Sequence, residues 1–325
     1  MHRTAGFVLV ALVGMASAAL AGDLQFGGLI QGQYTDERGE DSQFLVKSAR
    51  LRVDVPIADR IKGKLQVDFA REPEILDAAI DVTVVRYANF TVGQFKIPFG
   101  YDFQLPRYYL ETIERSLMMK KAFSNGASAP YVRDVGAMVR GNLKLLNYEV
   151  AVVNGTGYNY PDSTATLFPK WNMDNNNYKD VVGRIGIGIP MFAGLGFSLY
   201  EGKWECDQDR SAWDAYFHID TGKVLFQYEY MRGKGYLGKE SWMADKYSGY
   251  YITVGYRVLP LVQPTFRLDK FDPNRNEGGD GLADYYYGVN LNYSRTARLQ
   301  VFYRESKEGG KFDTSGWRAQ VSGIF

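Results

Sequence analysis

The sequence predicts an all-β fold, a transmembrane antiparallel β-barrel of about sixteen strands with a long third loop folded into its lumen. Hydropathy alternates residue by residue from about residue 23 onward, and long and short connections alternate between the apolar–polar segments. The chain contains 24 Tyr, 19 Phe and 35 Gly but only 11 Pro and one Cys. Barrel membrane proteins have such compositions because half of each strand faces water, the other half faces lipid, and aromatic residues gather at both interfaces.

The N-terminal segment predicts export from the cytoplasm. A basic start precedes an apolar run over residues 5–13, and small residues then lead to an A-x-A pattern that ends at Ala21. This order is typical of a signal peptide, so we expect residues 1–21 to be removed and residues 22–325 to form one outer-membrane barrel domain. A retained anchor helix is the alternative, but the apolar run is shorter than the roughly 18–20 residues that a membrane span needs.

Charge and cysteine content exclude several functional classes. The full chain has a formal charge of +1, and the loss of Arg3 with the signal peptide leaves equal numbers of acidic and basic residues. A neutral chain does not favour nucleic acid, whose binding depends on a basic excess. Cys206 is the single cysteine and His218 the one histidine after the signal peptide, which is too few for a zinc site. We therefore expect no metal and no cofactor.

The alternation is clearest in the last strand, where Trp317 and Val321 share one face and Arg318 lies on the other. A charged side chain on the lipid face costs about 2–4 kcal/mol at mid-membrane, so the charged face must line the lumen. The terminal Phe325 resembles the C-terminal signal that barrel-assembly machinery recognises, and we expect that partner. The same pattern predicts strands over 24–34, 44–55, 60–70, 76–86, 89–97, 134–142, 145–153, 180–189, 195–204, 211–219, 223–232, 248–258, 261–271, 284–293, 297–305 and 315–325.

The connections indicate which end of the barrel is which. The connections over 35–43 and 154–179 are long, whereas those over 56–59 and 190–194 are short. Outer-membrane barrels place short turns in the periplasm and long loops outside. A closed barrel also leaves no unpaired strand edge in lipid. A soluble β-sandwich or propeller is the alternative, but neither accounts for the alternating loop lengths together with the terminal phenylalanine.

The connection over residues 98–133 is far longer than the others need to be. Its stretch 106–121 mixes apolar and charged residues at near-helical spacing, and it has too many aromatic residues for a disordered segment. Long loops in compact proteins are usually functional. We expect this loop to fold into the lumen and narrow it.

Three short segments in and around this loop resemble the phosphate-selective porin O and P family: VGQFKIPFG at 92–100, ERS at 114–116 and RDVG at 133–136. The resemblance implies a bacterial outer-membrane porin that is sixteen-stranded and trimeric, with basic side chains that draw oxyanions to a constriction. By match to these segments it implies that Lys96, Arg115 and Arg133 lie at the constriction or its mouth.

The other basic residues fall into two sets. The loop itself adds three candidates for the constriction, namely Arg107, Lys120 and Lys121. Strand parity predicts a basic lumen lining made of Arg50, Arg52, Lys62, Lys64, Arg140, Arg184, Arg257, Arg267, Arg298, Arg304 and Arg318. Inward acids are fewer, so we expect a mildly basic channel, and rings of Arg and Lys are what anion pores use. Alternatively, each arginine pairs with a nearby acid and only holds the barrel wall open.

These features predict a porin that passively conducts small hydrophilic solutes through the bacterial outer membrane, with a preference for phosphate or another oxyanion. Its partners would be outer-membrane lipid, small anions or other hydrophilic solutes, and two further copies in a homotrimer. One alternative is a non-selective general porin whose lumen charges are mostly paired. The other is a structural barrel that sheathes an electron-transfer or secretion partner.

Three weaker signals do not change this interpretation. His218 shares a strand face with Asp214 and Asp220, but no serine motif accompanies it, so we expect no catalytic residue and no enzyme. The G-x-G pattern at Gly186 and Gly188 is expected by chance in a glycine-rich chain. The acidic and amide residues of 272–280 favour a solvated turn over a calcium site, although oxygen ligands do cluster there.

Overall fold

The structure is a computed structural model that describes residues 24–71, 73–122, 133–155, 177–189, 192–204, 208–235 and 246–325. The predicted signal peptide lies outside these residues. Sixteen strands are described: β1 (Gln25–Glu37), β2 (Gln43–Ala58), β3 (Ile61–Asp68), β4 (Glu74–Val85), β5 (Ala88–Lys96), β6 (Arg133–Leu143), β7 (Leu146–Val153), β8 (Asp180–Ile189), β9 (Ala193–Trp204), β10 (Gln208–Asp220), β11 (Val224–Lys234), β12 (Lys246–Tyr256), β13 (Val262–Asp272), β14 (Leu282–Leu291), β15 (Ala297–Glu308) and β16 (Lys311–Ile324).

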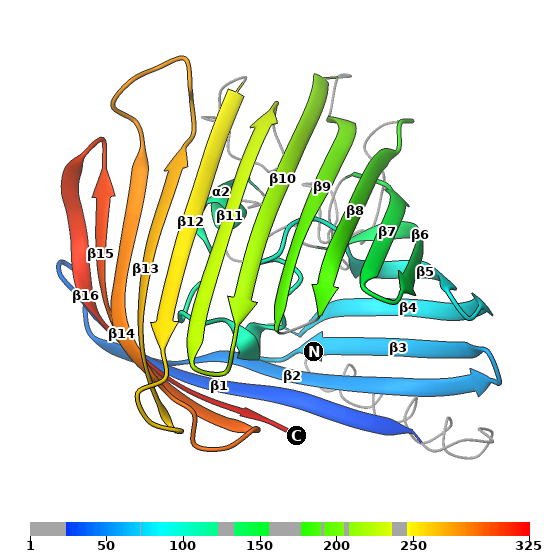
Figure 1. The fold of residues 1–325 in the computed structure, drawn as a ribbon, viewed down its shortest axis with the longest axis horizontal. Helices are drawn as coiled ribbons and strands as arrows, with labels where there is room; N and C mark the ends of the chain where they lie inside the picture. Colours follow the sequence, from blue (N-terminus) through cyan, green and yellow to red (C-terminus); the bar gives the residue numbers. More distant parts are fainter. Residues whose placement is uncertain are drawn as a thin grey trace, which may run out of the picture.

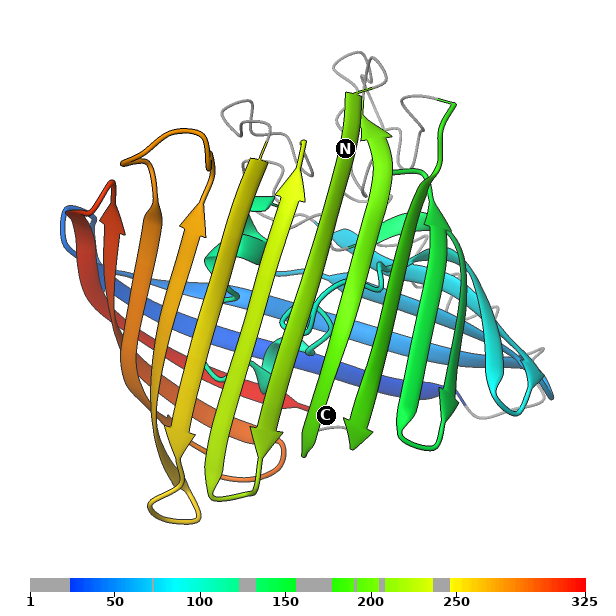
Figure 2. The ribbon, with the colours of Figure 1, turned by 45° about the horizontal axis from the view of Figure 1, so that its top comes forward.

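The strands form one closed antiparallel barrel (Figures 1 and 2). Each strand pairs with its neighbour in the chain, and β1 closes the barrel on β16 with Leu29 opposite Ile324. Closure leaves no strand edge unpaired, which is what a wall surrounded by lipid requires. The predicted fold class is confirmed, and every predicted strand is present with ends within a few residues of those expected. No helix in the described residues is long and apolar enough to cross a membrane.

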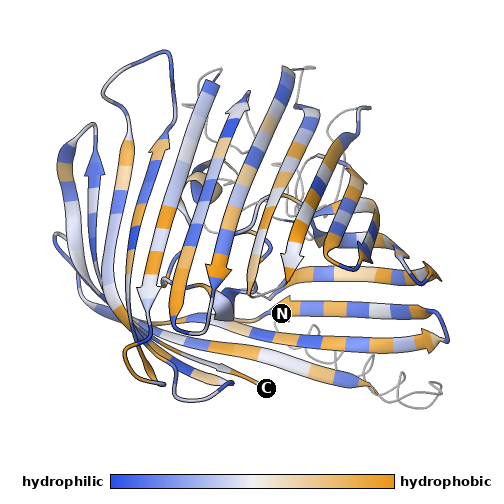
Figure 3. Ribbon diagram, in the orientation of Figure 1, coloured by the Kyte–Doolittle hydropathy of each residue, from blue (hydrophilic) through white to orange (hydrophobic). Residues whose placement is uncertain are grey.

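Alternation along the strands separates the two surfaces of the wall, as Figure 3 shows in its alternating colours. On β9, Leu195 and Leu199 are about half exposed on the outer surface, whereas Ser198 and Tyr200 are buried inside. A lipid-facing surface tolerates the apolar set but excludes charges, so this strand can face only one way.

A long segment after β5 runs inside the barrel (Figures 1 and 2). It contains the short 3-10 helix η1 (Arg107–Tyr109) and the helix α2 (Leu117–Ala122). We call residues 97–122 the inner loop; the remainder of the predicted loop lies outside the described residues. Its apolar side chains, among them Phe99, Phe103 and Met118, are fully buried in one cluster with inward-facing wall residues such as Phe271. Part of the lumen surface on which the inner loop packs is therefore apolar.

Parity alone leaves the orientation of strand 89–97 ambiguous, because apolar Phe90 and Val92 fall on the same face as Lys96. Gly93 accounts for the difficulty. Phe90 and Val92 face outward, with 37% and 47% of their surface exposed. Gly93 has φ +124°, and a Cβ built there would lie 2.3 Å from the carbonyl oxygen of Ala78. Only glycine fits this conformation and this close approach. The chain leaves the wall a few residues later, so Lys96 lies close to the inner loop and no longer follows the parity of the outward-facing residues.

Gly93→Ala is expected to destabilise the barrel by about 1–3 kcal/mol, because a side chain here is both strained and in contact with a backbone carbonyl. Urea titration of the purified barrel in detergent measures this. Gly32→Ala is the matched control, since a Cβ built at Gly32 meets nothing within 4 Å. Equal stability of the two variants would contradict the assignment.

Candidate functional site: the lumen and its constriction

The inner loop begins at a carboxylate that holds two backbone amides. Glu229 on β11 accepts hydrogen bonds from the backbone N–H of Tyr101 at 2.6 Å and of Asp102 at 2.9 Å. The N–H of Gly100 donates to the hydroxyl of Ser198 on β9 at 3.0 Å. Gly100 has φ +66°, and a Cβ there would lie 2.6 Å from Glu229 Oε1. The glycine lets the backbone approach closely enough for the carboxylate to accept both bonds.

A second set of contacts holds the middle of the inner loop at the short-turn end of the barrel. Arg298 donates to the carbonyl oxygens of Tyr108 at 3.2 Å and Leu110 at 2.9 Å, and to the carboxylate of Glu111 at 2.9 Å. The side chain of Gln263 also donates to Glu111, at 2.9 Å. Arg298 was predicted to line the lumen, and here it fixes the backbone of the loop.

A third set holds the return of the loop toward the long-loop end. Arg267 donates to the hydroxyl of Thr112 at 2.9 Å, and Asp269 accepts the backbone N–H of Leu117 at 2.8 Å. Glu114 receives Arg318 from β16 at 3.2 Å and Lys47 from β2 at 2.8 Å. The predicted lumen residues Arg267 and Arg318 thus also hold the loop.

Most of the remaining predicted lumen cations pair with acids of the wall. The ion pairs are Arg50–Asp68, Arg52–Asp54, Lys64–Asp77, Arg140–Asp81, Arg184–Glu149 and Arg304 with both Asp284 and Glu37. Arg257 instead donates to the Gly222 carbonyl and to Gln263. Lys62 is exposed and forms no ion pair with any described residue. The alternative in which arginines pair across the wall therefore holds for many of them individually.

One region of the lumen nevertheless holds more basic than acidic side chains. We define the cation cluster as Arg50, Lys64, Lys96, Arg107, Arg115 and Arg133. Arg133 and Lys64 share the carboxylate of Asp77, at 2.7 and 2.8 Å. Lys96 lies in the electrostatic field of Arg50, Arg115 and Arg133, and Arg50 in that of Arg107. In the described part of the chain, Asp68 pairs with Arg50, Asp77 with both Lys64 and Arg133, and Asp102 with Arg115.

Arg115 combines a structural role with a position in the cation cluster. Its guanidinium donates to the backbone carbonyls of Asp102 and of Leu105, the latter at 2.8 Å, and only 9% of the residue is exposed. Burial lowers the pKa of Arg115; Asp102 opposes this effect, and the neighbouring Arg50 and Arg133 add to it. The positive charges of the cation cluster therefore lie close enough to repel one another.

The structure brings four of the six predicted constriction residues together and separates the other two. Lys96, Arg107, Arg115 and Arg133 belong to the cation cluster. Lys120 and Lys121 lie on α2, which packs against β12, β13 and β14, and Lys120 Nζ is 3.9 Å from Asp284.

Two lumen residues, and the role of a third that strand parity does place inward, were not predicted from the sequence. Asp77 shares a face of β4 with Asp81, which pairs with the predicted lumen residue Arg140, so strand parity was sufficient to find it. Lys47 was hidden by a register shift between β1 and β2 at Gln31 and Gly32, which breaks the parity there. The role of Glu229 depends on loop atoms more than a hundred positions away, and no local pattern signals it. Within the described residues, no group of three or more His, Cys, Asp or Glu side chains is placed to hold a metal ion.

A closed sixteen-stranded antiparallel barrel with a loop packed inside its lumen is the architecture of a bacterial outer-membrane porin, and it points to a channel rather than an enzyme. Residues 23–144 match the family described as phosphate-selective porin O and P, which confirms the resemblance seen in the sequence. The protein is thus a porin of the bacterial outer membrane.

Solved porin structures share this fold at low sequence identity. An anion-selective porin from Comamonas acidovorans is similar with a TM-score of 0.66 and 10% identity, over 93% of this chain and 99% of that one. OmpF of Salmonella typhi, in complex with daunomycin, is similar with a TM-score of 0.67 and 12% identity, over 93% and 97%. The trimer form of Vibrio cholerae OmpT gives 0.65 and 11%, over 94% and 100%. No curated protein sequence matches the chain.

Glu229→Gln is expected to loosen the start of the inner loop, because the amide replaces one of two acceptors and leaves a buried N–H unpaired, at a cost of about 1–3 kcal/mol. We expect larger and noisier single-channel currents in a planar bilayer. Glu305→Gln is the matched control, since it removes a partly exposed pair with Lys307 at 3.2 Å. Unchanged currents in Glu229→Gln would mean that this contact does not set the pore.

Glu114 is expected to stabilise the loop even in mild acid. Burial alone raises the pKa of Glu114, but Lys47, Lys120 and Arg318 outweigh it and hold that pKa well below the ordinary 4.5. A depressed carboxyl pKa adds stability that is complete above the unfolded-state pKa and is lost as pH falls toward the folded-state value. The difference in unfolding free energy between the wild type and Glu114→Gln should stay constant from about pH 7 to 5.5 and shrink below about 4.5. A difference that shrinks above pH 5.5 would contradict this.

Proposed function

We propose that this porin passively conducts small anions, with phosphate or a related oxyanion as the preferred class. The excess of positive charge in the cation cluster carries the proposal. Six basic residues from β2, β3, β5, β6 and the inner loop converge there, and in the described residues Arg50, Lys64, Arg115 and Arg133 share the three carboxylates of Asp68, Asp77 and Asp102. An anion among these residues would relieve the mutual repulsion that crowding imposes on them.

The arrangement of the inner loop supports the same conclusion. Its anchors are mainly on β9, β11 and β13–β16, whereas the cluster takes its wall residues from β2, β3, β5 and β6. The loop therefore lines one side of the path with Arg107, behind which Arg115 is buried, and the wall lines the other side. The family match over residues 23–144 covers every residue of the cluster. The Comamonas porin of similar fold is itself described as anion-selective.

The non-selective alternative has one observation in its favour. Away from the cluster, Arg52, Arg140 and Arg184 each pair with an acid at 2.7–3.1 Å, so these parts of the lumen carry little net charge. Selectivity would then depend on the cluster alone. The sheath alternative is disfavoured because the inner loop occupies lumen space that an enclosed partner would need.

We further propose that the channel is a homotrimer. Its outer surface is apolar on every side in the described strands, as a lipid-facing or subunit-facing wall requires, and a trimer form exists for the similar Vibrio OmpT. A partner role for the barrel-assembly machinery at Phe325 and contact with outer-membrane lipid belong to the same proposal.

The reversal potential in a planar bilayer under a KCl gradient tests the anion preference. The wild-type value is expected near the chloride potential, and millimolar phosphate should reduce the current. Lys96→Met and Arg107→Ala should each lower the chloride-to-potassium permeability ratio by about 15-fold, because one unit charge about 5 Å away in water favours chloride and disfavours potassium by about 0.8 kcal/mol each.

Arg295→Ala is the matched control, because Arg295 is an exposed residue in the short turn between β14 and β15. It removes the same charge outside the cluster and should leave the reversal potential unchanged. A wild-type potential on the potassium side, or equal shifts in all three variants, would overturn the proposal and leave a general porin.

A further inference from the structure

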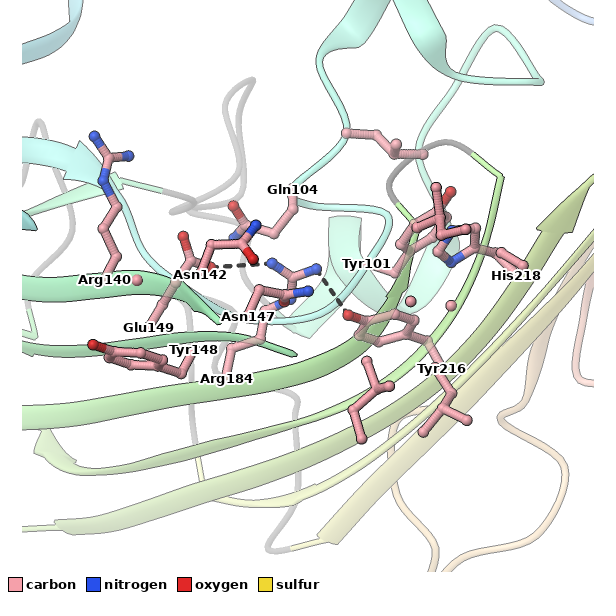
Figure 4. A pocket seen from close by; sticks show the side chains of 18 of the residues that line it. Tyr101, Gln104, Arg140, Asn142, Asn147, Tyr148, Glu149, Arg184, Tyr216 and His218 are labelled. Carbon is pink, nitrogen blue, oxygen red and sulfur yellow. Dashed lines mark hydrogen bonds and ion pairs between the residues drawn. The ribbon is translucent and has the colours of Figure 1, made fainter. Parts of the chain in front are cut away.

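A second polar site lies apart from the cation cluster, toward the short-turn end of the barrel. It is a cavity of about 440 Å³ between the start of the inner loop and the wall of β5–β10 (Figure 4). Tyr101 and Gln104 reach it from the loop, Arg184 from β8, and Tyr216 and His218 from β10. Its volume is in the range of small-molecule sites. Short turns face the periplasm in outer-membrane barrels, so this cavity lies near the exit of the channel.

Aromatic rings form one wall of the cavity. Tyr101 stacks on His218 with ring centroids 4.4 Å apart and an interplanar angle of 15°, and on Tyr216 at 5.2 Å and 27°. Glycines of the barrel wall lie under these rings: a Cβ at Gly194 would be 2.8 Å from His218 Cε1, and one at Gly196 2.3 Å from the Tyr216 hydroxyl. The rings can lie close to the wall only because these positions lack side chains.

His218 has hydrogen-bonding capacity that the protein does not use. The residue is only 8% exposed, yet neither Nδ1 nor Nε2 has a partner among the described residues. A buried polar group without a partner costs about 1–3 kcal/mol. Asn142 and Asn147 lie opposite each other on β6 and β7 at the other side of the cavity, and their amides make no side-chain hydrogen bond within the described chain. Each amide offers both donors and an acceptor.

The cavity carries little net charge, in contrast to the cation cluster. Arg184 donates to Glu149 at 3.1 Å and to the hydroxyl of Tyr216 at 2.8 Å (dashed lines in Figure 4). Arg140, at the edge of the cavity, pairs with Asp81 at 3.0 Å. Both arginines of the cavity are therefore paired with carboxylates, and neither offers an unpaired charge to an anion.

We propose that this cavity binds an uncharged, hydroxylated solute of about monosaccharide size. Hydroxyl groups both donate and accept, as the amides of Asn142 and Asn147 and the ring nitrogens of His218 require. The apolar C–H face of such a solute packs on an aromatic ring. The proposal goes beyond the anion preference and does not depend on it, because it uses a different set of residues.

D-glucose added to wild-type channels in KCl tests the proposal. We expect the ionic current to fall saturably with glucose concentration, on top of the small linear loss that bulk viscosity causes. His218→Phe keeps the stacking on Tyr101 but removes both nitrogens. It should raise the half-blocking glucose concentration about tenfold, the effect of one lost hydrogen bond at a buried site.

Two further variants make the outcome decisive. Asn147→Leu should weaken the glucose block in the same way, and it replaces His218→Phe if that variant does not fold. Arg107→Ala should leave the block unchanged while it shifts the reversal potential, which separates failure of this proposal from failure of the anion preference. A purely linear loss of current that is equal in all channels would overturn the proposal. Block by benzoate but not by glucose would also overturn it, in favour of an aromatic acid.

Discussion

The constriction depends on one contact, in which the carboxylate of Glu229 accepts hydrogen bonds from two backbone N–H groups of the inner loop. Tyr101 and Asp102 lie just after the chain leaves the wall at β5, so fixing their N–H groups sets the direction in which the inner loop enters the lumen. The apolar cluster around Phe99 and Met118 then removes this part of the lumen from water. The later contacts of Glu111 and Glu114 hold a loop whose path has already been set.

The basic residues predicted from the sequence serve two purposes in the lumen. Some hold the inner loop in place, and others face the path of the solute. Arg267, Arg298 and Arg318 all donate to the inner loop, and each also pairs with at least one carboxylate of the loop or the wall, which compensates its charge. Arg107 and Lys96 lie where the loop and the opposite wall meet. A count of lumen arginines is therefore a poor guide to selectivity, because geometry decides which of them a solute encounters.

Strand alternation was sufficient to predict the barrel. A lipid-facing surface excludes charge, so the charged positions of each strand show which of its faces points into the lumen. It failed where that rule is interrupted. Gly93 takes a positive φ and Lys47 lies at a register shift, and neither is visible in the hydropathy pattern. The cavity beside His218 was also beyond reach. The histidine and the glycines of β8 were each noticed and set aside, and only the fold shows that neighbouring glycines of this wall leave space for the rings of β10.

The spacing of the loop contacts along the chain has a consequence for how the channel is made. Tyr101 is 128 positions from Glu229, and Glu114 is 204 positions from Arg318. The inner loop is synthesised before almost every strand that holds it, and contacts at such separations form late because the intervening chain must be ordered first. Closure of the wall, which places Leu29 of β1 opposite Ile324 of β16, joins residues that are still farther apart in the chain. The closed wall and the placement of the inner loop therefore both depend on the last strand to be made, because β16 pairs with β1 and its Arg318 holds Glu114.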